Sequence, residues 1–151
     1  MSFRLRNDAR HWFRHIRGNG FSIDFDSYYF CFMAGIASGQ KEDMKASDTT
    51  EFISYFPERY KSKSKLMIAL FLKKELKLMG VEIQEKKSVH AVISPLIDPE
   101  SPSNLSETGF REFNKYAHGG FEAILDWFDD EPRTLDTFLR NYKRKIDDAL
   151  A

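Results

Sequence analysis

The chain has 151 residues, of which 42% are hydrophobic and 15% aromatic, and its 23 basic side chains balance its 23 acidic ones. A chain of this length buries well over half of its unfolded surface in one core and needs no disulfide staples, so we expect residues 1–151 to form a single helical domain. The zero formal net charge excludes the overall basic character of a protein that coats nucleic acid.

The first part of the chain predicts two helices. Residues 3–17 follow a helical pattern that ends at the turn-forming sequence Gly18-Asn19-Gly20. A second helix is expected to begin at Asp24 or Asp26, either of which can cap free amide groups, and to end before Gly39. Because this second helix is apolar on almost every side, we predict that it lies at the centre of the fold.

Two further helices are expected in the middle of the chain. Asp48, followed three residues later by Glu51, forms a capping-box pattern for a short helix that Pro57 ends. The segment 62–79 predicts a longer helix, because an apolar run is followed by a lysine-rich last turn and by Gly80.

The segment after this helix is less regular. Residues 81–93 are enriched in β-branched side chains and are compatible with a small β-hairpin. Residues 94–106 contain three prolines together with serine and aspartate, which is typical of a loop.

A fifth helix carries the most informative stretch of the sequence. Apolar residues from Phe110 to Phe128 recur at helical spacing, and the pattern keeps its phase across Gly119 and Gly120. Each glycine costs a helix roughly 1 kcal/mol relative to alanine, so we expect a neighbouring helix or a ligand to pass close to this backbone. A last helix covers 135–150. The predicted fold is a mainly α, compact bundle of five to six helices.

Charged side chains are unevenly distributed along the chain. The first predicted helix is rich in arginine, with Arg4, Arg6, Arg10, Arg14 and Arg17. The middle of the chain is rich in lysine, with Lys61, Lys63, Lys65, Lys73, Lys74 and Lys77. Acidic residues gather at Asp126, Asp129, Asp130 and Glu131. This asymmetry is compatible with ordinary solvated helix faces or with a surface that binds nucleic acid or a protein partner, and the five arginines are the candidate binding residues.

Arg111 and His118 are the candidate catalytic pair. Seven residues apart on a helix, they lie on one side and about 10 Å apart along the axis, with Asn114 between them as a third candidate. A guanidinium binds a phosphate with two hydrogen bonds, and an imidazole transfers protons near neutral pH, so the pair suits cleavage of a phosphodiester by a ribose 2′-hydroxyl. The alternative is that His118 caps or packs against a neighbouring helix and that Arg111 is a surface residue.

The spacing from Arg111 to His118 resembles the Arg-x4-6-His motif of the HEPN superfamily, whose members are compact all-α domains of similar size. The segment Asn114–Gly120 is also similar to helical segments of HEPN-like proteins, although Arg10 with His15 makes a second instance of the motif. The resemblance implies a homodimer with metal-independent ribonuclease activity at its two-fold interface, or a binding-only relative, typically in bacterial defence or toxin systems. In the ribonuclease, Arg111 would hold the scissile phosphate and His118 would act as acid or base.

Other signals are weaker. Cys31, the only cysteine, lies in an apolar run and is expected to be a free thiol in a reducing cytoplasm. No apolar run approaches the roughly 20 residues that cross a bilayer, so neither a signal peptide nor a membrane span is predicted. His11 and His15 are one turn apart, but only Asp8 lies nearby as a third ligand, and we predict no metal site and no cofactor.

The sequence leaves two functional hypotheses. The favoured one is a non-catalytic helical accessory subunit, as in a bacterial defence-type complex, that acts through protein or nucleic-acid contacts. Its anchors would be the arginine-rich first helix, the last helix, or aromatic side chains such as Trp12 and Tyr116. The second is a HEPN-like ribonuclease that uses Arg111 and His118. Either hypothesis predicts a protein partner or a second copy of the chain, with RNA or DNA as a further candidate.

Overall fold

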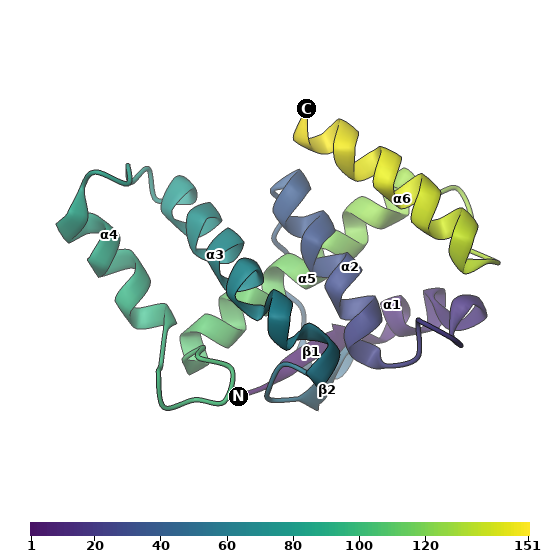
Figure 1. Cartoon of the computed structure of the whole chain (residues 1–151), viewed down its shortest axis with the longest axis horizontal. Helices are drawn as coiled ribbons and strands as arrows, with labels where there is room; N and C mark the ends of the chain where they lie inside the picture. Colours follow the sequence, from purple (N-terminus) through teal and green to yellow (C-terminus); the bar gives the residue numbers. More distant parts are fainter. The chain divides into compact units, whose positions relative to one another are not determined.

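The computed structural model describes residues 1–151 and contains six α-helices and one two-stranded antiparallel β-sheet (Figure 1). In chain order the elements are β1 (Phe3–Arg6), α1 (Asn7–Trp12), α2 (Asp24–Ser38), β2 (Thr49–Ile53), α3 (Lys61–Leu78), α4 (Lys86–Ile93), α5 (Glu107–Trp127) and α6 (Leu135–Leu150). The predicted mainly α fold with a small sheet is therefore confirmed. None of the helices combines the length and the apolar character that crossing a membrane requires.

The chain divides into two compact units. The first comprises Met1–Phe3 with Ile53–Phe113, and the second comprises Arg4–Phe52 with Asn114–Ala151. Helix α5 and both strands continue from one unit into the other. The single domain expected from the sequence stays a prediction.

The core of the first unit is built on aromatic rings. Phe3 meets Phe56, Phe110 and Phe113 edge to face, with ring centroids 5.0, 5.0 and 5.8 Å apart. Phe71 of α3 adds a further edge-to-face contact with Phe113 at 5.1 Å. Aromatic pairs prefer such arrangements because the positive ring edge faces the negative ring face. These contacts fix α3 and the first turns of α5 on the N-terminal residues of β1.

The core of the second unit depends on close contact between the backbones of α2 and α5. A Cβ atom added at Gly120 would lie 1.6 Å from the carbonyl oxygen of Cys31, and one added at Gly35 would lie 2.0 Å from that of Tyr116. A Cβ at Gly119 would also collide with the backbone, 2.5 Å from a carbonyl oxygen. The expectation that a neighbouring helix passes close to the paired glycines is confirmed, and α5 continues through them without a break.

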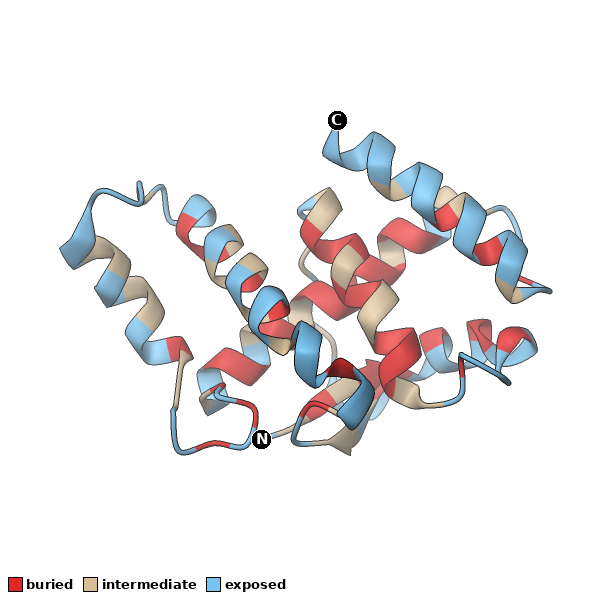
Figure 2. Ribbon diagram, in the orientation of Figure 1, coloured by how far each residue is buried: buried red, intermediate tan, exposed pale blue.

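Helix α6 packs on α2 within the second unit. Its Phe138 and Tyr142 are buried against Phe30, with ring centroids 5.3 and 4.9 Å apart. The Tyr142 hydroxyl also donates a hydrogen bond to the Phe30 carbonyl oxygen at 2.8 Å. The rest of α6 is mostly exposed (Figure 2).

The helix ends follow the predicted signals. Gly39 and Gly80 adopt φ values of 73° and 68° after α2 and α3, the left-handed conformation in which glycine is favoured. Asp26 accepts hydrogen bonds from the backbone amides of Ser22 and Ile23 at the start of α2. These caps place both helices within one or two residues of their predicted bounds.

Three segments differ from the prediction. Strand β1 occupies the start of the helix expected over 3–17, and strand β2 replaces the short helix expected after Asp48. The hairpin expected over 81–93 is absent there, because residues 86–93 form helix α4, which packs on α3. The two strands pair only with each other. Their partners are far apart in sequence, and local patterning does not report such pairing.

The close crossing of α2 and α5 predicts that Gly120→Ala destabilises the protein. In an isolated helix this change is stabilising by about 1 kcal/mol. Here the added methyl group meets the Cys31 carbonyl, so we expect a loss of about 3 kcal/mol in the free energy of unfolding, as in severe overpacking. Urea denaturation measures it. Gly18→Ala is the matched control, because a Cβ at Gly18 meets nothing within 4 Å. Equal midpoints for the two variants would contradict the close crossing.

Candidate functional site

Asn114 serves as a buried connector within the second unit. Its side-chain oxygen accepts a hydrogen bond from the backbone amide of Arg4 at 3.1 Å and another from the Tyr28 hydroxyl at 2.8 Å. One carboxamide thereby ties β1 and α2 to α5. This role accounts for a polar side chain that is 6% exposed, because buried polar groups are hydrogen-bonded.

His118 is enclosed in the same unit. The residue is 5% exposed, and its Nδ1 atom has no hydrogen-bond partner. Burial, together with the nearby positive charges of Arg6 and Arg4, lowers the pKa of His118 from 6.5 to about 4, although Asp43 and Asp8 oppose this shift. The imidazole is therefore neutral at physiological pH, because its charged form would be desolvated beside two guanidinium groups.

Arg111 has the opposite environment and is exposed to solvent. The proposed catalytic pair requires that Arg111 and His118 lie on one continuous helix, and the unbroken α5 meets this condition. The enclosure of His118 fails a second condition, because a general acid or base must come within hydrogen-bonding distance of the reacting group. The alternative weighed for His118, packing among neighbouring elements, describes its environment.

Arg6 is the most enclosed of the five candidate arginines. It is 6% exposed, and its guanidinium lies 2.7 Å from a carboxylate oxygen of both Asp8 and Glu122. It also donates to the backbone carbonyl oxygen of His118 at 3.2 Å. A guanidinium with this set of bonds holds β1 against α5 and is not available to an external phosphate.

Three more of these arginines are paired with acidic residues of the same unit. Arg10 and Arg17 both bind Asp24, and Arg14 lies 2.7 Å from Glu131. Burial acts to raise the pKa of Asp24, but the two arginines outweigh it, so the pKa is lowered. The arginine-rich segment is thus largely neutralised by acidic residues of the chain itself.

Arg4 completes the set. Its Nε donates to the Thr49 hydroxyl at 2.8 Å, and its guanidinium contacts the Ala46 carbonyl oxygen at 3.3 Å and Glu51 at 3.5 Å. All five arginines therefore make intramolecular contacts. An external polyanion would have to compete with these contacts, which weakens the interpretation of this segment as the binding surface.

The lysines of α3 are placed differently. Lys65, Lys73 and Lys77 are exposed, and no acidic side chain forms an ion pair with them. Lys61 pairs with the exposed Glu58 at 2.9 Å, and such exposed pairs are weak. Along α3, the first and last of the three free lysines are separated by about 18 Å. The structure thus distinguishes two basic segments that look alike in the sequence: the arginines of the N-terminal segment are paired, and these lysines are not.

Lys74 shows how strongly the lysines crowd this helix. Burial lowers the pKa of Lys74, and the positive charges of Lys77 and Lys73 lower it further. A lowered lysine pKa means that the local surroundings disfavour a further positive charge. An external anion at this face would relieve that repulsion.

The prediction that Trp12 and Tyr116 are aromatic anchors for a partner is wrong. Trp12 is 6% exposed and Tyr116 is 1% exposed, so both belong to the core. Large exposed apolar side chains lie instead around the end of α3, where Met79 is 68% and Ile83 75% exposed. The sequence feature that could have indicated these exposed apolar residues is the apolar run that continues past the lysine-rich last turn of α3 and Gly80.

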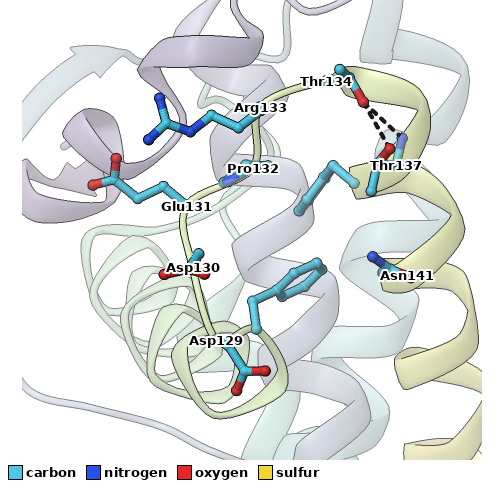
Figure 3. Close-up of a pocket in the computed structure, with 10 residues that line it drawn as sticks. Asp129, Asp130, Glu131, Pro132, Arg133, Thr134, Thr137 and Asn141 are labelled. Carbon is cyan, nitrogen blue, oxygen red and sulfur yellow. Dashed lines mark hydrogen bonds between the residues drawn. The ribbon is translucent and has the colours of Figure 1, made fainter.

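The connection between α5 and α6 forms a pocket of about 300 Å³ (Figure 3). Phe128 and Phe138 supply its apolar lining, and Asp129 and Asp130 lie along the connecting chain. The Thr134 side chain accepts a hydrogen bond from the Thr137 amide and caps α6 at one side of the pocket. No three His, Cys, Asp or Glu side chains are grouped here in a way that could hold a metal ion.

Comparisons with protein-family models, with curated proteins and with solved structures found no match. Function is therefore inferred from the residues themselves.

The buried imidazole predicts a pH dependence of stability. The unfolded chain takes up a proton at His118 near pH 6.5, whereas the folded chain does so only near pH 4. Because the unfolded state binds more protons in this window, the free energy of unfolding should fall as the pH is lowered from 6.5 to about 4. The contribution is at most about 3 kcal/mol.

Urea denaturation at a series of pH values measures this effect. His118→Gln keeps the side-chain size but does not titrate, so it should flatten the dependence of the free energy of unfolding on pH. The difference should be clearest above about pH 5, where most carboxylates are already ionised and contribute little to this dependence. If the wild type and the variant kept parallel curves, the assignment of the pH dependence to His118 would be wrong.

The arginine contacts predict unequal costs of removing them. Arg6→Gln breaks two ion pairs and a buried hydrogen bond to backbone, and we expect it to lower the free energy of unfolding by about 2 kcal/mol. Arg17→Gln removes an exposed contact and should cost under about 1 kcal/mol. Thermal denaturation of both variants ranks them, and the reverse order would contradict the structural role of Arg6.

Proposed function

We propose that the chain is a non-catalytic helical subunit that acts through contact with another macromolecule, and that the exposed lysine face of α3 is its contact surface. The α3 lysine face is defined as Lys65, Lys73 and Lys77. The observation that supports the proposal is that these ammonium groups are exposed and unpaired, whereas the arginines of the N-terminal segment are engaged within the chain.

Comparison with α6 supports a binding role for the α3 lysine face beyond that of an ordinary solvated helix surface. Helix α3 carries six lysines and one acidic residue, Glu75, which is buried. Helix α6, of similar length, mixes four basic and three acidic residues, and its Lys143 pairs with Asp147 at 2.7 Å. A solvated face interleaves the two signs as α6 does. An excess of one sign favours association with an anionic partner.

Leu66 adds an apolar element to the same helix. Its side chain is 58% exposed and lies next to Lys65 in the sequence. Contact surfaces that combine exposed apolar side chains with charges at their rim are typical of macromolecular interfaces. The partner therefore offers negative charge together with some apolar surface.

The proposal predicts the behaviour of Lys65→Glu/Lys73→Glu/Lys77→Glu. Wild-type protein is immobilised and titrated with RNA, with duplex DNA and with an extract of its source cells. The triple variant should weaken whichever association is found by at least about tenfold, because it reverses three charges at the contact. If the partner is a nucleic acid, the slope of log K against log salt should fall by about 2 to 3.

Arg140→Glu/Arg144→Glu/Lys145→Glu is the matched control. It makes the same change of net charge at exposed positions of α6, so it should bind like the wild type. Equal loss in both triple variants would show that net charge alone controls binding, and it would contradict the α3 lysine face. Wild-type protein that binds none of the three and does not associate with a second copy of itself would overturn the proposal itself.

The ribonuclease alternative has its own test. Single-stranded RNA is incubated in EDTA with the wild type, His118→Ala and Arg111→Ala. We expect intact RNA in all three reactions, because His118 is enclosed. Cleavage by the wild type that is lost in both variants would contradict the non-catalytic proposal.

A further inference from the structure

An apolar groove lies beside the α3 lysine face within the first unit. Ile83, in the turn between α3 and α4, borders two adjoining hollows of about 380 and 470 Å³. The first is lined by residues at the end of α3, including Leu76, and by residues of the turn that follows it, including Val81. The second is lined by α4, chiefly Val89 and Ile93. We call these two hollows the α3–α4 groove.

Helix α4 leaves this groove incompletely covered. None of its residues is buried (Figure 2), although Val89 and Ile93, one turn apart, form an apolar side of the helix. Ile83 is the most exposed large apolar residue of the chain, at 75%. Removal of apolar surface from water is favourable, so an occupant with apolar side chains is stabilised here.

Positive charge surrounds the α3–α4 groove. Lys73 and Lys77 line one hollow and Lys86 lines the other. No acidic side chain pairs with these three lysines, and Glu82 is the only acidic residue of the lining. An occupant must therefore combine apolar side chains with carboxylates.

The end of α5 in the second unit has this complementary character. Leu125 is 40% exposed, and Asp126, Asp129 and Asp130 are exposed without an ion pair or hydrogen bond. Figure 3 shows Asp129 and Asp130 on the connection that follows α5. Of this acidic run only Glu131 is held by a basic residue, Arg14. We call Leu125, Asp126, Asp129 and Asp130 the acidic end of α5.

We propose that the α3–α4 groove of one copy of the chain receives the acidic end of α5 of a second copy. This inference rests on the proposed function, since it names the partner of the α3 lysine face. The two surfaces match in charge and both contain exposed apolar side chains. The zero net charge of the chain removes the general repulsion that opposes association of like molecules.

The shape and chemistry of the groove favour a protein occupant. A nucleic-acid backbone would satisfy the lysines but would leave the apolar lining of Val89 and Ile93 in water. A membrane surface requires a protruding apolar surface, whereas this one is hollow. Because the two contacting surfaces differ, the contact is heterologous, and it can join copies into a ring or an open chain.

The proposal predicts self-association that depends on concentration and on salt. Sedimentation of the wild type should show a mass above that of one chain at high micromolar concentration, and about 0.5 M NaCl should reduce that mass because it screens the charges. A groove variant, Lys73→Glu/Lys77→Glu, and an end variant, Asp126→Lys/Asp129→Lys, should each associate at least about tenfold more weakly, because like charges then face each other.

Mixing the two variants gives the decisive measurement. The intact acidic end of the groove variant matches the intact groove of the end variant, and the two altered surfaces match each other. An equimolar mixture should therefore associate although neither variant does alone, which also shows that both are folded. Arg140→Glu/Lys145→Glu, with the same charge change as the groove variant, should not weaken self-association.

Several results would overturn the inference. A wild type that stays monomeric up to millimolar concentration excludes the second copy as the occupant, and so does a mixture that fails to associate. Binding of RNA, DNA or another protein through the α3 lysine face by such a monomer would leave the proposed function standing. Unchanged binding of every partner by the α3 triple variant would contradict both the proposed function and the inference about the second copy.

Discussion

The close crossing of α2 and α5 is the constraint on which the second unit depends. A backbone carbonyl of each helix faces a glycine of the other, Cys31 at Gly120 and Tyr116 at Gly35. Because no Cβ atom fits between them, the register of α5 against α2 is fixed to a single residue. That register decides which side chains of α5 are enclosed, and it carries His118 into the interior.

The enclosed polar side chains show how residue types suited to catalysis become structural. Asn114 accepts two hydrogen bonds, and Arg6 donates hydrogen bonds to His118 and Glu122 of α5 and to Asp8. His118 remains with a nitrogen that has no partner and with a lowered pKa. A motif defined by one arginine and one histidine at helical spacing does not distinguish these environments, because spacing determines the side of the helix but not what covers it.

Sequence patterning predicted α2, α3, α5 and α6 because each has a long apolar period and a glycine, proline or polar residue at its ends. It missed the strands because β1 and β2 are stabilised by pairing with each other although they lie far apart in the sequence. It missed α4 because its β-branched residues favour strands locally, whereas packing on α3 decides the outcome. The sequence shows where the basic residues are, but it does not show which of them form ion pairs.

Pairing within the chain, rather than charge content, separates structural from available charges. The sequence balances 23 basic against 23 acidic side chains, yet the balance is not local. Arg10 and Arg17 share Asp24, whereas Lys65, Lys73 and Lys77 of α3 and Asp126, Asp129 and Asp130 form no ion pair inside the chain. Unpaired groups of opposite sign therefore lie on α3 in the first unit and at Asp126, Asp129 and Asp130 in the second, each beside exposed apolar side chains. A neutral chain with this arrangement carries both halves of a contact.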